Sequence, residues 1–283
     1  MTRRELASGL LLPAVGALAL GRPDSIVNGV ILGCHTWCFR DMPLDEAIKA
    51  MRETGLKYCE LGHRHVEPWP SPRAELRKWR LTVPMDFFKT IRRQFDDAGI
   101  ELYAYNLNIS SDFSDDELAR GFEMADALGL KRMTSTTRVS MTRRIDAFAS
   151  RAKTIVGLHN HSLIKPDEFA TPESFEEALR GASAYIGVNL DVGHFSAAGF
   201  NPLEYIEKWH DRMVTIHLRD RKKNQGLVTR CGEGDTPIRE IVQLLRHRKS
   251  RVPVMVETEY RDGAPADEPR RYYELCRKFL EAS

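Results

Sequence analysis

Short apolar runs alternate with amphipathic stretches along most of the chain. Eight of the runs have the apolar and β-branched composition of buried strands, near residues 29–34, 57–61, 101–106, 131–135, 154–159, 186–191, 214–218 and 253–257. A stretch with apolar residues at helical spacing follows each run, near residues 43–54, 84–98, 114–128, 140–152, 172–182, 202–211, 236–248 and 266–281. This alternation predicts a parallel sheet covered by helices, in the α/β class. Eight repeats in about 255 residues predict a (β/α)8 TIM barrel, which would occupy residues 28–283 as a single domain.

Glycines mark several of the predicted helix-to-strand turns. Gly55, Gly99 and Gly129 each come at the end of a predicted helix, and an apolar residue follows each of them. This is the pattern of a helix that ends at a left-handed residue and leads into a strand. An open doubly wound sheet is the alternative, but no G-x-G-x-x-G motif follows the first predicted strand, which disfavours its dinucleotide-binding form. The longest connection, residues 62–83, contains Trp69 and several prolines, and fits either a lid or a solvated surface loop.

Four of the predicted strands run directly into residues that can bind a metal or move a proton. These residues are His159, Asp191, His217 and Glu257. One polar residue in such a position is most simply a cap for the end of its strand. Four of them indicate a polar site, because the carboxyl ends of all strands in a barrel meet at one face. We therefore expect these four side chains to lie together.

The donor atoms of this set predict a metal site. Two imidazoles and two carboxylates suit one divalent ion such as Mn, Zn, Co, Fe or Mg. No cysteine belongs to the set, which disfavours a structural zinc site. The four residues come from separate strands, so the prediction of a metal depends on the prediction of the fold.

The first 27 residues differ in character from the rest of the chain. Arg3 and Arg4 precede an apolar stretch, which contains an A-x-A cleavage motif that ends at Ala19. This layout resembles a twin-arginine export signal. We expect residues 1–27 to be a signal peptide and linker, and the protein to be periplasmic or extracellular. If the segment is an ordinary helix or tail, the protein is cytoplasmic.

Charge and cysteine content exclude several other functions. The net charge is +2 without a basic block, so we expect no nucleic-acid partner. The N-terminal apolar stretch is too short for a stable membrane insertion. The five cysteines are scattered and odd in number, which is not the pattern of a disulfide framework. The sequence leaves the oligomeric state open.

A series of motifs in the second half of the chain resembles one family of TIM barrels. In chain order they are His159-Asn160-His161, Leu190-Asp191-Val192-Gly193-His194, Ala198-Gly199-Phe200-Asn201-Pro202, Ile216-His217-Leu218-Arg219-Asp220, Gly232-Glu233-Gly234-Asp235 and Val256-Glu257. This ordered set resembles the xylose-isomerase-like TIM-barrel superfamily, and within it the sugar phosphate isomerase/epimerase-like proteins. The resemblance implies one divalent metal ion (Mn, Zn, Co or Mg) bound by Asp191, His217 and Glu257.

The chain departs from this family at the fourth ligand. The ketose epimerases have a glutamate on strand five, whereas this chain has Gly157 at the position that aligns most simply. His159 comes two residues later and projects to the same side of the strand. We expect His159 to be either the fourth ligand or a base beside the metal.

The resemblance also implies proton-transfer chemistry on a carbohydrate. A metal that bridges a carbonyl and a neighbouring hydroxyl acidifies the C–H bond between them, and Glu257 is the first candidate to remove that proton, with His159 the second. The metal-stabilised enediolate then leads to epimerisation, isomerisation or β-elimination. We therefore expect a metal-dependent isomerase or epimerase that acts on a sugar or keto-sugar. A sugar lyase or dehydratase, for example one acting on an oxidised glycoside, is the alternative. A non-catalytic sugar-binding barrel and a nuclease fit less well.

Further polar residues near the predicted strand ends are candidates for binding the substrate. They are Glu60, His63, His161, His194 and Arg219. For His161 and His194, a hydrogen bond to the backbone is the alternative. Arg219 stands where many relatives have lysine, and an ion pair with Asp220 that orients His217 is its alternative role.

Overall fold

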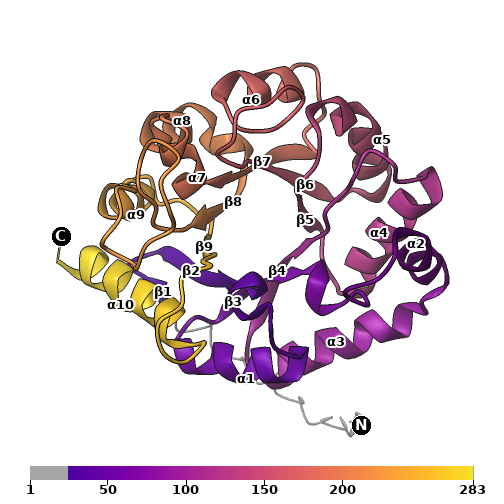
Figure 1. Cartoon of the computed structure of the whole chain (residues 1–283), viewed down its shortest axis with the longest axis horizontal. Coiled ribbons are helices and arrows are strands. Elements are labelled where there is room, and N and C mark those ends of the chain that lie inside the picture. Colours follow the sequence, from indigo (N-terminus) through magenta and orange to yellow (C-terminus); the bar gives the residue numbers. More distant parts are fainter. Residues whose placement is uncertain (1–24, 283) are drawn as a thin grey trace, which may run out of the picture.

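The computed structural model describes residues 25–282, which form a closed barrel of strands surrounded by helices (Figure 1). The strands of the barrel are β2 (Val30–His35), β3 (Tyr58–Gly62), β4 (Glu101–Asn106), β5 (Arg132–Ser135), β6 (Ile155–His159), β7 (Ile186–Asp191), β8 (Met213–Leu218) and β9 (Val254–Val256). They are parallel and pair in sequence order, and β2 also pairs with β9, which closes the barrel. A short strand, β1 (Ile26–Val27), pairs antiparallel with β2. The predicted TIM barrel is therefore confirmed.

Helices surround this barrel (Figure 1). They are α1 (Leu44–Thr54), α2 (Arg73–Thr82), α3 (Met85–Asp97), α4 (Asp115–Ala127), α5 (Thr142–Ala152), α6 (Pro172–Leu179), α7 (Val192–Ala197), α8 (Pro202–Trp209), α9 (Ile238–His247) and α10 (Asp267–Glu281), with 3-10 turns η1 (Thr36–Phe39), η2 (His63–His65), η3 (Val139–Met141) and η4 (His210–Arg212). In α9, for example, the buried side chains are Ile238, Ile241, Val242 and Leu245, which form one stripe along the helix.

The predicted helix-to-strand turns have the expected backbone. Gly55, Gly99 and Gly129 have φ values of 85°, 70° and 71°, in the left-handed region that glycine adopts without a steric penalty. An apolar, buried residue follows each glycine, as in the predicted pattern. These turns place the start of the next strand directly after each helix.

The connection over residues 62–83 contains a helix that the sequence pattern did not predict. Arg80 of α2 donates two hydrogen bonds to Glu67, with lengths of 2.6 and 2.8 Å, and both side chains are buried. Arg73, at the start of α2, also binds Glu117 of α4. This connection is therefore neither a plain surface loop nor a detached lid, because ion pairs fix it against the body of the barrel.

The predicted signal peptide falls almost entirely outside the described residues. Within residues 25–282, no helix has the length and apolar composition needed to cross a bilayer.

Candidate metal centre

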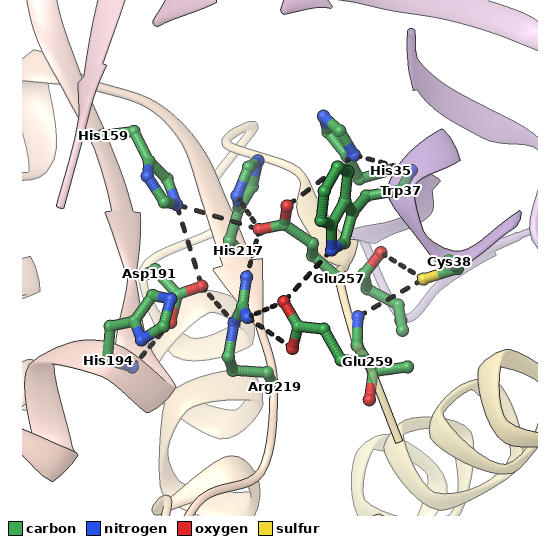
Figure 2. A network of polar contacts seen from close by, with 12 residues as sticks. His35, Trp37, Cys38, His159, Asp191, His194, His217, Arg219, Glu257 and Glu259 are labelled. Carbon is green, nitrogen blue, oxygen red and sulfur yellow. Dashed lines mark hydrogen bonds and ion pairs between the residues drawn. The ribbon is translucent and has the colours of Figure 1, made fainter. Parts of the chain in front are cut away.

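The four predicted metal ligands meet at the C-terminal end of the barrel (Figure 2). His159 ends β6, Asp191 ends β7, His217 lies in β8, and Glu257 directly follows β9. One potential ligand atom from each residue lies within 4.8 Å of the corresponding atoms of the other three. All four side chains are buried, so the cluster could hold a metal ion.

Two ring nitrogen atoms of this cluster make no hydrogen bond to the described residues 25–282. These atoms are His159 Nε2 and His217 Nδ1, and both are buried. His159 Nε2 lies 3.8 Å from Asp191 Oδ2 and also from Glu257 Oε2, whereas His217 Nδ1 lies 2.7 Å from Glu257 Oε2 without the alignment of a hydrogen bond. Ligands of a four-coordinate ion with bonds of about 2.1 Å are roughly 3.4 Å apart. The residues present therefore fit a divalent metal.

Asp191 has a structural role as well as a place in the cluster. Its Oδ1 atom accepts a hydrogen bond of 2.7 Å from the backbone N–H of His194 and caps the N-terminus of α7. Its Oδ2 atom faces His159 and Arg219. The two carboxylate oxygens of Asp191 therefore have different roles. Oδ1 caps helix α7, and Oδ2 belongs to the site.

The orientation of His217 depends on residues behind it. Its Nε2 atom lies 2.9 Å from Glu60 Oε1 and 3.0 Å from Asn189 Nδ2, which leaves Nδ1 to face the cluster. Burial alone would lower the pKa of His217, but the carboxylates of Glu60 and Glu257 raise it well above its usual value. Such a carboxylate–histidine pair orients the imidazole and increases its basicity as a ligand.

Glu60 does not have the surroundings expected of a substrate contact. Its side chain is fully buried behind His217, accepts a hydrogen bond from the Thr134 hydroxyl, and is not part of the cavity wall. Its contacts suit an interaction with His217 instead. The strand-end rule detected the carboxylate but could not show that it lies beneath the imidazole.

Arg219 joins the two ligand carboxylates. It donates hydrogen bonds of 2.5 Å to Asp191 Oδ2 and to Glu257 Oε2, and two more to Glu259. Burial raises the pKa values of Asp191 and Glu257, but Arg219 outweighs this effect and holds both well below their usual range. Both carboxylates are therefore ionised at neutral pH.

The alternative partner predicted for Arg219 is wrong. Asp220 points away from the site and accepts hydrogen bonds from the backbone N–H groups of Gly232, Gly234 and Thr236. It organises the following loop, and Arg219 is free to bind the carboxylates of the site.

A cavity of about 280 Å³ lies over the cluster. Its wall contains four of the predicted substrate contacts, His63, His161, His194 and Arg219. Burial lowers the pKa of His161 to about 4 and holds the pKa of His194 well below its usual value, so both are neutral at pH 7 and can donate and accept hydrogen bonds.

Several residues of the cavity wall were missed in the sequence. The most central is His35, which ends β2, packs edge-on against His217 at 5.3 Å between ring centroids, and lies 3.8 Å from Glu257. Burial lowers the pKa of His35 to about 4. The rule that selected His159 would also have selected His35, since it too follows an apolar strand. Trp37, Arg64 and Glu259 carried no such signal.

The barrel interior explains the glycine at position 157. A Cβ atom there would lie 3.0 Å from Val214 Cβ and 3.2 Å from Asn189 Cβ, tighter than ordinary contacts. Little space therefore remains for a larger side chain at position 157, which lies deeper in the barrel than the cluster. His159, one layer higher, provides the strand-five side chain that faces Asp191 and Glu257.

The comparison with protein families agrees with this architecture. A family model described as Xylose isomerase-like TIM barrel matches residues 48–282. The chain belongs to this family. No curated protein matches the chain.

Solved structures with the same fold have low sequence identity to this family member. One is an uncharacterised protein from Parabacteroides distasonis, with 23% identity, a TM-score of 0.64 and coverage of 90% of this chain and 100% of the other. Another is 3-keto-D-glucoside 4-epimerase from E. coli, with 14% identity, a TM-score of 0.67 and coverage of 88% and 99%. A third is a probable 3-DHS dehydratase from Bacillus anthracis, with 15% identity, a TM-score of 0.66 and coverage of 86% and 97%. At these identities, the likeness shows the fold alone.

Proposed function

We propose that this protein is a metal-dependent isomerase or epimerase that acts on a sugar or keto-sugar. The observation that carries the proposal is the buried cluster of four ligand atoms within 4.8 Å, which lies at the base of a cavity of about 280 Å³. A cavity of this size approaches the lower end of the range for small-molecule sites, about 300–1,000 Å³. One sugar ring is a suitable occupant.

His159, Asp191, His217 and Glu257 would hold the metal. Two imidazoles and two carboxylates favour Mn, Zn or Co over Mg, which prefers oxygen ligands. When bound, a divalent ion supplies Lewis acidity that weakens the C–H bond next to a substrate carbonyl.

Glu257 is the first candidate for the group that accepts the proton. Arg219 and His217 hold its pKa low despite burial, so the carboxylate is available in its ionised form at neutral pH. His159 is the second candidate, because its Nε2 atom has no hydrogen-bond partner in the described part of the chain and its side chain lines the same cavity. Return of the proton to the opposite face of the carbon gives epimerisation, and return to the adjacent carbon gives isomerisation.

A lyase or dehydratase is the second candidate function. Removal of the same proton followed by loss of a β-substituent gives elimination, and one structure with the same fold bears the name of a dehydratase. We also propose that the protein is exported, as Arg3, Arg4 and the following apolar stretch suggest. An exported enzyme would favour an unphosphorylated sugar.

The test combines metal analysis with hydrogen exchange. Purified protein should bind about one Mn²⁺, Zn²⁺ or Co²⁺ and should catalyse metal-dependent uptake of solvent deuterium into a member of a panel of keto-sugars and oxidised glycosides. Asp191→Asn should remove both properties, whereas Asp211→Asn, on a fully exposed side chain, should preserve them. NMR analysis of the product separates epimerisation and isomerisation from elimination. Absence of metal binding, or uptake that is equal without metal, would refute the proposal.

A further inference from the structure

An unusual arginine forms part of the cavity wall. Arg64, in η2, is half-buried, and its guanidinium lies 5.3 Å from the ring centroids of both Trp37 and Trp69. Within residues 25–282, this guanidinium has no hydrogen bond or ion pair to another side chain or to the backbone. Its hydrogen-bond donors are thus available beside the cavity, and cation–π contacts with two indole rings stabilise its position.

The segment that carries Arg64 and Trp69 is fixed at several points. The ring of His65 lies 3.1 Å from the carbonyl oxygen of Phe39. Glu67 is buried and forms the paired hydrogen bonds with Arg80 of α2. Both contacts are made by residues between Arg64 and Trp69, so these two side chains have a preorganised position rather than the freedom of a loop tip.

Trp37 connects this segment to the metal centre. Its Nε1–H group donates a hydrogen bond of 3.1 Å to Glu259, which in turn binds Arg219 (Figure 2). Trp37 and Arg64 both belong to the cavity wall, whereas Trp69 lies beyond it with 54% of its surface exposed. A continuous row of Trp37, Arg64 and Trp69 therefore leads outward from the cavity.

The size of the cavity limits what can bind inside it. Its volume of about 280 Å³ suits one sugar ring, and a second ring would have to lie outside. The exposed indole of Trp69 is a flat apolar surface of the type on which the C–H face of a sugar can pack. The donors of Arg64 lie between the two positions and can bind the ring oxygens and hydroxyls.

We infer that Arg64 and Trp69 form an outer subsite for the second ring of a glycoside whose first ring occupies the cavity. This inference rests on the proposed function and deepens it, because it names the substrate class as an oxidised glycoside with at least two rings. Arg64 donates hydrogen bonds to the second sugar, and Trp69 stacks against its apolar face.

The test compares two ligands with the same first ring. One is the methyl β-glucoside oxidised to a ketone at C3, and the other is cellobiose with the same ketone on its non-reducing ring. Calorimetry with the full chain and Mn²⁺ should show that the two-ring ligand binds about tenfold more tightly than the one-ring ligand. Trp69→Ala and Arg64→Met should each remove most of this preference. Phe87→Ala, which changes a partly exposed aromatic ring of α3, should preserve it.

The possible results separate the subsite from the function. Equal affinity for both ligands, or an equal loss for both in Trp69→Ala, would refute the outer subsite while leaving sugar binding intact. The carboxymethyl 3-keto-glucoside serves as a third ligand that carries an anionic group in place of the second ring. If this ligand alone binds more tightly than the methyl glucoside, and Arg64→Met removes the preference, the subsite binds an anion and the inference is overturned. If neither ligand binds and no ligand of the keto-sugar panel takes up deuterium, both the subsite and the proposed function fail.

Discussion

Replacement of Glu60 by glutamine tests how the protein prepares His217 for a metal. Glu60 Oε1 lies 2.9 Å from His217 Nε2, and together with Glu257 it raises the pKa of this imidazole well above its usual value. The metal-free protein therefore carries a protonated His217 at neutral pH. Because a metal ligand must be deprotonated, metal binding should release this proton, and affinity should rise with pH until the pKa is passed.

Two opposite effects determine how Glu60→Gln changes the affinity for the metal. An opposite charge at this distance raises a neighbouring pKa by about 1–3 units, so its removal should reduce competition from the proton by about 10- to 1,000-fold at low pH. Loss of the carboxylate that orients the imidazole should weaken metal binding by about 10- to 100-fold at every pH. We therefore expect the variant to bind metal more weakly than wild type at pH 8.5. At pH 6 the difference should shrink or reverse.

Calorimetric titration of Mn²⁺ or Zn²⁺ at several pH values checks this expectation. Repeating each titration in two buffers with different ionisation enthalpies gives the number of protons released, which should be close to one for wild type at pH 7 and smaller for the variant. Thr134→Val is the matched control, because it removes a hydrogen bond to Glu60 and keeps the carboxylate. A variant curve parallel to wild type at all pH values would show that Glu60 does not control the protonation of His217.

Three further predictions use other parts of the chain. His159→Ala should lower metal affinity by roughly 10-fold or more if His159 is a ligand. If His159 is only a base, the variant should keep its metal while turnover falls by about 10²–10⁴-fold. His161→Ala changes another histidine of the cavity wall and is the control in the metal titrations, where it should keep the wild-type affinity. Glu67→Gln should reduce the free energy of unfolding by up to about 3–5 kcal/mol, because buried Arg80 then keeps only the carboxylate of Glu117, which lies 3.5 Å from its Nη1 atom; urea denaturation measures this loss, and a value below about 1 kcal/mol would contradict it. Residues 1–19 should be absent from exported protein by mass spectrometry, and an intact N-terminus on cytoplasmic protein would contradict the export prediction.

The barrel could be predicted from the sequence because its signals are local. Each strand is a short apolar run, and turns such as those at Gly55, Gly99 and Gly129 need only a few neighbouring residues. Helix α2 is different, since its buried side chains are Leu76 and Arg80. A buried arginine does not contribute to a hydrophobic stripe, and the acidic partners that make its burial possible lie elsewhere in the sequence.

The sequence predicted the main residues of the site but not the depth at which each side chain lies in the barrel. The strand-end rule selected His159, Asp191 and Glu257 because parallel strands bring their ends together. It also selected Glu60 but assigned it to the substrate, since sequence position does not show whether a side chain lies above or below its neighbour. Arg64 was invisible to the same rule because it lies on a turn after its strand.

The charges around the cluster give a reason to expect that it binds a divalent ion. Three buried carboxylates, those of Glu60, Asp191 and Glu257, face the two cations Arg219 and protonated His217. When His217 gives up its proton to become a ligand, these three carboxylates and Arg219 have a net charge of −2, which a divalent ion neutralises; Glu259, which also binds Arg219, is partly exposed to water and is not included in this count. Burying uncompensated carboxylates is costly, so the exchange of a proton for a metal is favoured as the pH rises. Arg219 therefore keeps the carboxylates ionised and in position, and the metal would supply the remaining positive charge.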